Sequence, residues 1–208
     1  MVRLMDMGLD KLNSLLLEMA NLSESAVASA MEAYEKGGQA KQVREWSEQL
    51  RSLHHQVSDL SIEVIARYQP VASDLRFVKA CFEISYGFFR YGRYAKDIVE
   101  VLEMVGDIGK CDHSLVNETA QKTQQMIRMS IDAFTRRDVT LARQIPKMDD
   151  FVDDRYRQHL KQFLDKKANL KCSMTAALIL RYLERIADHA SYIAESVEYI
   201  VTGTEPIK

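Results

Sequence analysis

Apolar side chains recur at intervals of three and four residues along most of the chain. The stripe is clearest near the C-terminus, where it runs through Leu183, Ile186, Ala190, Ile193, Val197 and Ile200. Between residues 78 and 102 the same spacing continues less regularly. This is the period of an α-helix that buries one side. The pattern therefore predicts an all-α chain of amphipathic helices.

Helix-breaking residues interrupt the pattern at Gly37-Gly38, Gln69-Pro70, Gly106 to Gly109, Arg136 to Asp138 and Lys166 to Ala168. The breaks leave about six helices, several of which would be roughly 45 Å long at a rise of 1.5 Å per residue. Pro146 falls inside the fifth helical pattern, and because proline lacks an amide donor we expect it to start or kink that helix. Short connections between long helices favour antiparallel packing.

Composition and charge narrow the class of protein further. With 8 Gly and 3 Pro in 208 residues, the chain holds few of the turn residues that a mostly β protein needs. Its 28 basic and 30 acidic residues give a net charge of −2, which argues against non-specific nucleic-acid binding. Asp6 and Asp10 interrupt the N-terminal apolar run, so no signal peptide is expected. The longest plain apolar stretch, Ala176 to Leu180, is far too short to predict a membrane span. We therefore expect the protein to be located in the cytoplasm.

The three cysteines give no sign of a paired framework. Cys81, Cys111 and Cys172 lie far apart in the sequence, without a CxxC pair. We interpret them as free thiols, buried or idle, in a reducing compartment.

Three blocks of sequence repeat in the same order. Residues 24–34 align with 124–134 at an offset of 100, and residues 74–76 and 90–95 align with 169–171 and 185–190 at an offset of 95. Amphipathic helices resemble one another, but chance rarely keeps three blocks in order at nearly one offset. We therefore expect an internal duplication into two antiparallel three-helix bundles, residues 1–108 and residues 109–208.

Two segments resemble the signature of the PhoU family. One runs from Arg181 to Glu195 (RYLERIADHASYIAE) and is followed by Val201-Thr-Gly203; the other runs from Arg67 to Arg76 (RYQPVASDLR). With the duplication, the resemblance covers essentially the whole chain. It implies a cytoplasmic regulatory adaptor that has no enzymatic turnover and forms a homodimer or higher oligomer. Such an adaptor acts between the ATPase of a phosphate ABC transporter and a sensor histidine kinase, and it restrains phosphate uptake and signalling. It reaches the membrane only through these partners.

The resemblance also implies a metal site. PhoU proteins carry acidic pairs, four positions apart, on the second and third helices of each half, and these pairs bind metal clusters on the bundle surface. Matched residue by residue, the second half keeps Asp149 with Asp153 and Glu184 with Asp188. Acids four apart share one side of a helix. All-oxygen ligation suits Mg, Mn or ferric iron better than structural zinc, and the implied cofactor is a carboxylate-bound cluster of iron, Mg, Mn or Zn.

An ordinary charged face is the alternative for Glu184 and Asp188. In that interpretation Arg181 and Arg185 are their ion-pair partners. At about 100° per residue both acids point away from the apolar stripe. A site formed by them is therefore expected at the surface.

The first half departs from the family pattern. The expected acids are replaced by Ser47, Arg51, Phe89 and Arg93. A multivalent cation would meet positive charge there, so we expect the first cluster to be missing. Either the two arginines pair with neighbouring acids, Glu48, Asp97 or Glu100, or they form an anion site.

Other signatures of chemistry are weak. The sequence has no Glu-x-x-His for a di-iron oxidase, no Gly-rich phosphate loop and no Ser or Cys nucleophile motif. His54 and His55 are adjacent and point to different sides of a helix, so we expect both to be solvated or to lie at an interface. His189 directly follows Asp188 and is therefore a candidate neighbour of the metal site. A metal-dependent hydrolase acting on phosphorylated substrates is the rival function, since a carboxylate-bound cluster can activate water. A purely structural protein is the third possibility.

Overall fold

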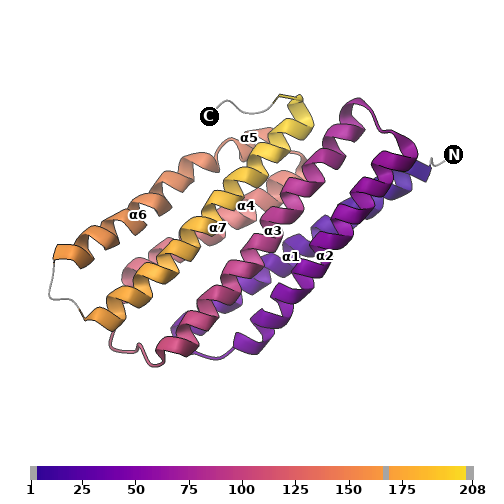
Figure 1. The fold of residues 1–208 in the computed structure, drawn as a ribbon. Coiled ribbons are helices and arrows are strands. Elements are labelled where there is room, and N and C mark those ends of the chain that lie inside the picture. Colours follow the sequence, from indigo (N-terminus) through magenta and orange to yellow (C-terminus); the bar gives the residue numbers. More distant parts are fainter. Residues whose placement is uncertain (1–3, 166–168, 205–208) are drawn as a thin grey trace.

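The structure, a computed structural model, describes residues 4–165 and 169–204. Within these ranges the chain forms seven helices and no strand: α1 (Leu4–Lys36), α2 (Ala40–Tyr68), α3 (Ala72–Val105), α4 (Ser114–Arg136), α5 (Val139–Ala142), α6 (Pro146–Asp165) and α7 (Leu170–Thr202). Six of the helices are long and α5 is a single turn (Figure 1). The predicted all-α fold is confirmed. None of the described helices has the length and apolar character needed to cross a membrane.

The helix ends follow the predicted breaks. α1 stops before Gly37 and Gly38, whose positive φ angles favour glycine. α6 begins at Pro146, where a missing amide donor costs nothing because the first helical turn has unpaired donors. The predicted break at 166–168 lies outside the described residues.

α3 and α7 lie side by side through the middle of the molecule (Figure 1). α1 and α2 pack against α3, while α4 and α6 pack against α7. The predicted stripe on α7 is buried along its whole length. One hydrophobic core runs through both bundles, and the division of the chain into residues 1–108 and 109–208 stays a prediction.

Two glycines bring α3 close to its neighbours. A Cβ atom at Gly92 would lie 2.3 Å from Cδ1 of Leu50 on α2, and one at Gly87 would lie 2.8 Å from the side chain of Ile193 on α7. These are sterically forbidden contacts. The absence of a side chain at both positions therefore permits the close packing of α3 between α2 and α7.

Cys111 and Cys172 form a disulfide, with their Cα atoms 5.4 Å apart. The interpretation of all three cysteines as free thiols is wrong for this pair and correct for Cys81, which is buried. The two bonded residues are 61 positions apart in sequence. They meet because the segment after α3 and the first turn of α7 lie at the same end of the molecule, a tertiary proximity that cysteine spacing does not reveal.

Candidate functional site

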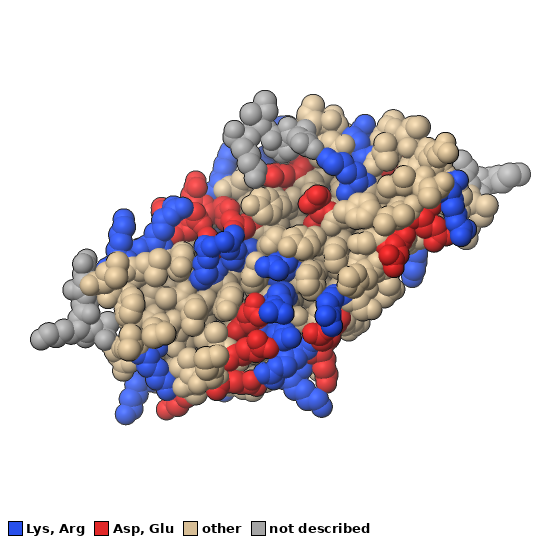
Figure 2. All heavy atoms as spheres, viewed as in Figure 1, with Lys and Arg blue, Asp and Glu red and all other residues tan. Residues whose placement is uncertain are grey.

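Four acidic side chains from α6 and α7 gather on one side of the second bundle. Asp149 and Asp153 are four positions apart on α6, as Glu184 and Asp188 are on α7. The two helices pack against each other, and Asp149 is electrostatically coupled to each of the other three carboxylates. The structure therefore brings together the four residues that the family resemblance singles out. Figure 2 shows acidic and basic side chains interspersed over α6 and α7.

This acidic cluster is partly buried. Glu184 is 9% exposed, and Asp149, Asp153 and Asp188 are intermediate between buried and exposed. The expectation of a surface site is wrong for Glu184. Helical periodicity turns this side chain away from the main apolar stripe of α7, but α6 packs against α7 and helps to cover it.

Three of the four acids have an arginine partner. Arg157 pairs with Asp153 at 2.6 Å, Arg185 pairs with Asp188 at 3.3 Å, and Arg181 pairs with Glu184. The ring of Tyr156 lies 5.5 Å from the Arg181 guanidinium carbon, a cation–π contact that helps to position this arginine. The sequence-based alternative, in which Arg181 and Arg185 pair with the acids of α7, is thus present in the structure.

Asp149 differs from the other three acids. Its Oδ2 accepts a hydrogen bond of 3.4 Å from the Ser191 hydroxyl, while its buried Oδ1 has no hydrogen-bond partner in the described part of the chain. Burial raises the pKa of Asp149 to about 7, and repulsion from Asp188 and then Asp153 adds to the effect. Asp149 therefore exchanges its proton near neutral pH.

Burial also raises the pKa values of Glu184 and Asp188. Repulsion from Asp188 acts on Glu184 in the same direction, whereas the neighbouring arginines lower both values. Oε2 of Glu184 is buried without a hydrogen bond among the described residues, and Nε of Arg185 lies 3.7 Å from it in an ion pair. The arginines therefore offset the charge of Asp153, Glu184 and Asp188 more than that of Asp149.

The donor chemistry suits a hard cation, although the side chains are not arranged as a finished binding site. Across residues 4–165 and 169–204 no group of three or more His, Cys, Asp or Glu side chains is placed to hold a metal ion. Oδ1 of Asp149 is nevertheless buried without a hydrogen bond among the described residues, and Oε2 of Glu184 has only the Arg185 guanidinium at 3.7 Å. A buried carboxylate oxygen is costly unless a proton or cation neutralises it. A metal ion could use these oxygens if the arginines released theirs.

The corresponding positions of the first half hold other interactions. Arg51 pairs with Glu48, and Arg93 pairs with Asp97 at 3.1 Å. Ser47 is buried. Of the two alternatives for Arg51 and Arg93, the structure contains the first, ion pairs with neighbouring acids.

Phe89 stands where the family pattern has an acid, and its side chain takes part in aromatic stacking. Its ring stacks on His54 with centroids 5.6 Å apart, and Nδ1 of His54 shares a hydrogen bond of 2.9 Å with the Ser85 hydroxyl. His54 is thus a partly buried interface residue, one of the two roles expected for it.

His189 contacts aromatic rings between α3 and α7. Its ring lies 5.6 Å from those of Tyr86 and Tyr192 and 6.0 Å from that of Tyr94. Burial and then the nearby Arg90 guanidinium lower the pKa of His189 to about 4. His189 is therefore neutral at physiological pH and belongs to the contact between the two bundles.

Sequence reasoning missed two residues of the acidic cluster. Arg157 lies four positions after Asp153, a spacing that predicts a helical ion pair. Ser191 lies three positions after Asp188 and is on the same side of α7, but its hydrogen bond to Asp149 depends on how α6 packs. Only the first of these could have been found from spacing.

Comparisons with known proteins agree with the fold. Residues 16–102 and 116–197 match the PhoU domain. The chain is 31% identical over 205 residues to the phosphate-specific transport system accessory protein PhoU homolog of Pseudomonas aeruginosa, covering 95% of this chain and 85% of that protein. It is 28% identical over 213 aligned positions to the homolog of Clostridium acetobutylicum, covering 98% and 96%. The crystal structure of PhoU from Pseudomonas aeruginosa matches with a TM-score of 0.87 at 30% identity, over 96% of this chain and 99% of that one.

Proposed function

Since the chain belongs to the PhoU family, we propose that it is a regulatory accessory protein of phosphate transport. The observation that carries the proposal is that both halves match the family's domain, at residues 16–102 and 116–197. The relatives from Pseudomonas aeruginosa and Clostridium acetobutylicum are named accessory proteins of the phosphate-specific transport system. The chain covers most of the length of both relatives, so the proposal extends to the whole protein.

The regulation that we propose is negative. The chain would restrain phosphate uptake and signalling by contacting the ATPase of a phosphate ABC transporter and a sensor histidine kinase. We propose a cytoplasmic homodimer that reaches the membrane only through these partners. Long helices with mixed surface charge, such as α6 and α7, offer extended faces for such docking.

Restoration of regulation in a deletion strain tests this role. In a bacterium that lacks its own PhoU gene, production of this chain should lower the uptake of radiolabelled phosphate. The immobilised chain should also retain the transporter ATPase, whereas an unrelated helical bundle of similar net charge should not. Unchanged phosphate uptake together with no retained ATPase would show that the proposed role is wrong.

We further propose that the acidic cluster of α6 and α7 binds a cluster of iron, Mg, Mn or Zn. Asp149, Asp153, Glu184 and Asp188 would hold it through carboxylate oxygens, and the bound cations would supply the positive charge that now comes from arginines and protons. The buried Oδ1 of Asp149, which has no hydrogen bond among the described residues, supports this proposal. Elemental analysis of protein purified without chelator tests it.

A metal-dependent hydrolase acting on phosphorylated substrates remains the second candidate, because a carboxylate-bound metal cluster can activate water. A panel of phosphate esters with added Mg²⁺ or Mn²⁺ distinguishes the two functions. Turnover that disappears in Asp149→Asn would favour the hydrolase, and no turnover with retained ATPase binding would favour the regulator.

A further inference from the structure

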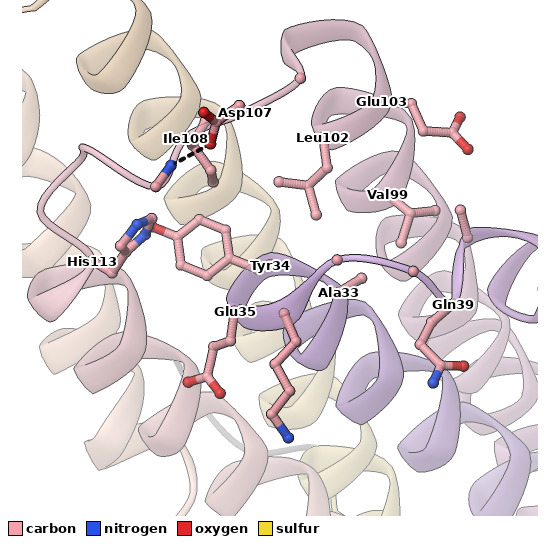
Figure 3. A pocket seen from close by; sticks show the side chains of 16 residues that line it. Ala33, Tyr34, Glu35, Gln39, Val99, Leu102, Glu103, Asp107, Ile108 and His113 are labelled. Carbon is pink, nitrogen blue, oxygen red and sulfur yellow. Dashed lines mark hydrogen bonds between the residues drawn. The ribbon is translucent and has the colours of Figure 1, made fainter.

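The linker between α3 and α4, residues 106–113, forms one wall of a pocket. The pocket has a volume of about 570 Å³ and lies where the α1–α2 loop, the end of α3 and the linker meet (Figure 3). Ile108 and His113 of the linker line it, opposite Ala33 and Leu102 of the helices. The shape of this pocket therefore depends on where the linker lies.

The linker is attached to both halves of the molecule. On one side, Nδ1 of His113 shares a hydrogen bond of 2.7 Å with the Tyr34 hydroxyl of α1, and their rings make an edge contact at 4.9 Å. Figure 3 shows these two side chains turned toward each other. On the other side, Cys111 is bonded to Cys172 in the first turn of α7. The disulfide is thus a covalent attachment of the linker to the second bundle.

The surroundings of Cys172 favour thiol chemistry. Cys111 and Cys172 are both partly exposed, but Cys111 lies between Lys110 and Asp112, whereas Cys172 directly follows the exposed Lys171. The amide of Cys172 donates to the side chain of the N-cap residue Asn169, which places this cysteine at the positive end of a helix. A basic neighbour and a helix N-terminus stabilise a thiolate, the reactive form of cysteine, so Cys172 is the more reactive thiol of the pair.

Cys81 provides an internal contrast. Its side chain is fully buried in α3. Burial raises the pKa of its thiol to about 12, so it holds its proton and is shielded from reagents. The chain therefore separates one inert thiol from two accessible ones that are close enough to bond.

We propose that Cys111 and Cys172 form a reversible thiol–disulfide switch that fixes the linker 106–113 to α7 when oxidised and releases it when reduced. The inference does not need the proposed regulatory role, but it rests on the proposed cytoplasmic location. Disulfides of proteins in reducing compartments are mostly transient and redox-sensing, and the exposure of this pair suits exchange with a small disulfide of the glutathione class.

The exchange takes place in two balanced steps. One cysteine thiolate attacks glutathione disulfide, forming a mixed disulfide and releasing one glutathione thiolate, which takes up a proton. The second cysteine thiolate then displaces the other glutathione and closes the protein disulfide. Two cysteine thiols are oxidised, and one glutathione disulfide is reduced to two glutathione thiols. The reverse reaction with excess glutathione reopens the bond.

Thiol counting at defined glutathione ratios tests the switch. The full chain is equilibrated across ratios of reduced to oxidised glutathione, quenched with acid, denatured and alkylated with a maleimide that adds a visible mass per thiol. We expect Cys111 and Cys172 to become protected together as the ratio falls, both in the original chain and in Cys81→Ser. In Cys111→Ser the paired step should be lost. Two thiols that stay free, or stay bonded, at every ratio would overturn the proposal.

Limited proteolysis tests the release of the linker. Lys110 is exposed in the linker, so trypsin cleavage after it reports on the local opening of this segment. We expect this cleavage to be several-fold faster in the reduced chain, while cleavage after the exposed Arg67, at the far end of α2 and outside the pocket, keeps its rate. In Cys111→Ser the reductant should have no effect on either cleavage. Equal rates of cleavage after Lys110 in both redox states would contradict the switch even if the disulfide forms reversibly.

Discussion

Ser191 on α7 donates a hydrogen bond to Asp149 on α6 over 3.4 Å. The contact lies within a group of acids whose other three members each have an arginine partner. A neutral hydroxyl is therefore the hydrogen-bond donor to the carboxyl whose pKa rises to about 7. Asp149 is accordingly the member of the cluster whose charge responds most directly to pH.

Replacing Asp149 with Asn should reduce the dependence of stability on pH. The pKa of Asp149 is about 7 in the folded chain and near 4 when unfolded. Between these values the folded state binds the extra proton, so the free energy of unfolding falls as pH rises from 4 to 7. Partial exposure weakens the effect, and we expect a loss of about 1–3 kcal/mol between pH 5 and pH 8 that Asp149→Asn lacks.

Urea unfolding at pH 5 and pH 8, in the presence of a chelator, measures this difference. Ser191→Ala is the matched control, because it removes the hydrogen bond to the carboxyl but leaves the ionisable group in place. Parallel pH profiles for the original chain and Asp149→Asn would show that Asp149 titrates normally.

The metal proposal predicts opposite effects for acidic and basic substitutions. Glu184→Ala combined with Asp188→Ala should abolish bound metal, since half of the carboxylate ligands are lost. Arg157→Ala should strengthen metal binding, because Arg157 competes for Asp153. Elemental analysis and calorimetric titration provide the measurements. Arg51→Ala and Arg93→Ala, in the first half, are the controls and should leave the stoichiometry unchanged.

An unchanged metal content in the double acidic variant would make the four residues an ordinary charged surface. The same titration should also show tighter binding at pH 8 than at pH 6, because Asp149 must lose its proton before it can act as a ligand. A pH-independent affinity would place the metal elsewhere.

Gly92→Ala should destabilise the first bundle. The added methyl would lie 2.3 Å from Cδ1 of Leu50, and such overpacking costs about 1–3 kcal/mol. Alanine is more favourable than glycine inside a helix by about 1 kcal/mol, so we expect the free energy of unfolding to fall by about 1 kcal/mol in total. Chemical denaturation gives the value. In a Leu50→Ala background the penalty should vanish, and an equal penalty there would rule out the steric explanation.

Reduction of the disulfide should lower thermal stability. A bond that closes a long loop typically stabilises a fold by about 2–4 kcal/mol, which corresponds to roughly 5–15 °C in Tm for a chain of this size. Calorimetry with and without reductant measures the shift. Cys111→Ser should be insensitive to reductant, and a similar shift in that variant would mean that the reductant acts elsewhere.

Local sequence signals predicted the helices and their ends because these depend on near neighbours. Pro146 begins α6 and Gly37 follows α1 for reasons contained in each residue's own backbone. The resemblance located the acidic pairs, and helical spacing placed each pair on one side of its helix. These features require no knowledge of how the helices pack.

Contacts between distant segments could not be predicted in the same way. The burial of Glu184 depends on the position of α6, and the bond between Cys111 and Cys172 depends on how the linker approaches α7. Helical periodicity describes one helix at a time. It carries no information on which residues of two helices meet.

The packing of α3 against α7 bears on the history of the chain. In the predicted division of the chain, these are the third long helices of the two halves. If the halves are copies, a single-repeat ancestor with the same surface would have paired with a second copy of itself through it. Fusion of two copies would have made that pairing intramolecular, with a strength independent of protein concentration. Each half would then have been free to diverge, and acidic pairs in only one half are what such divergence predicts.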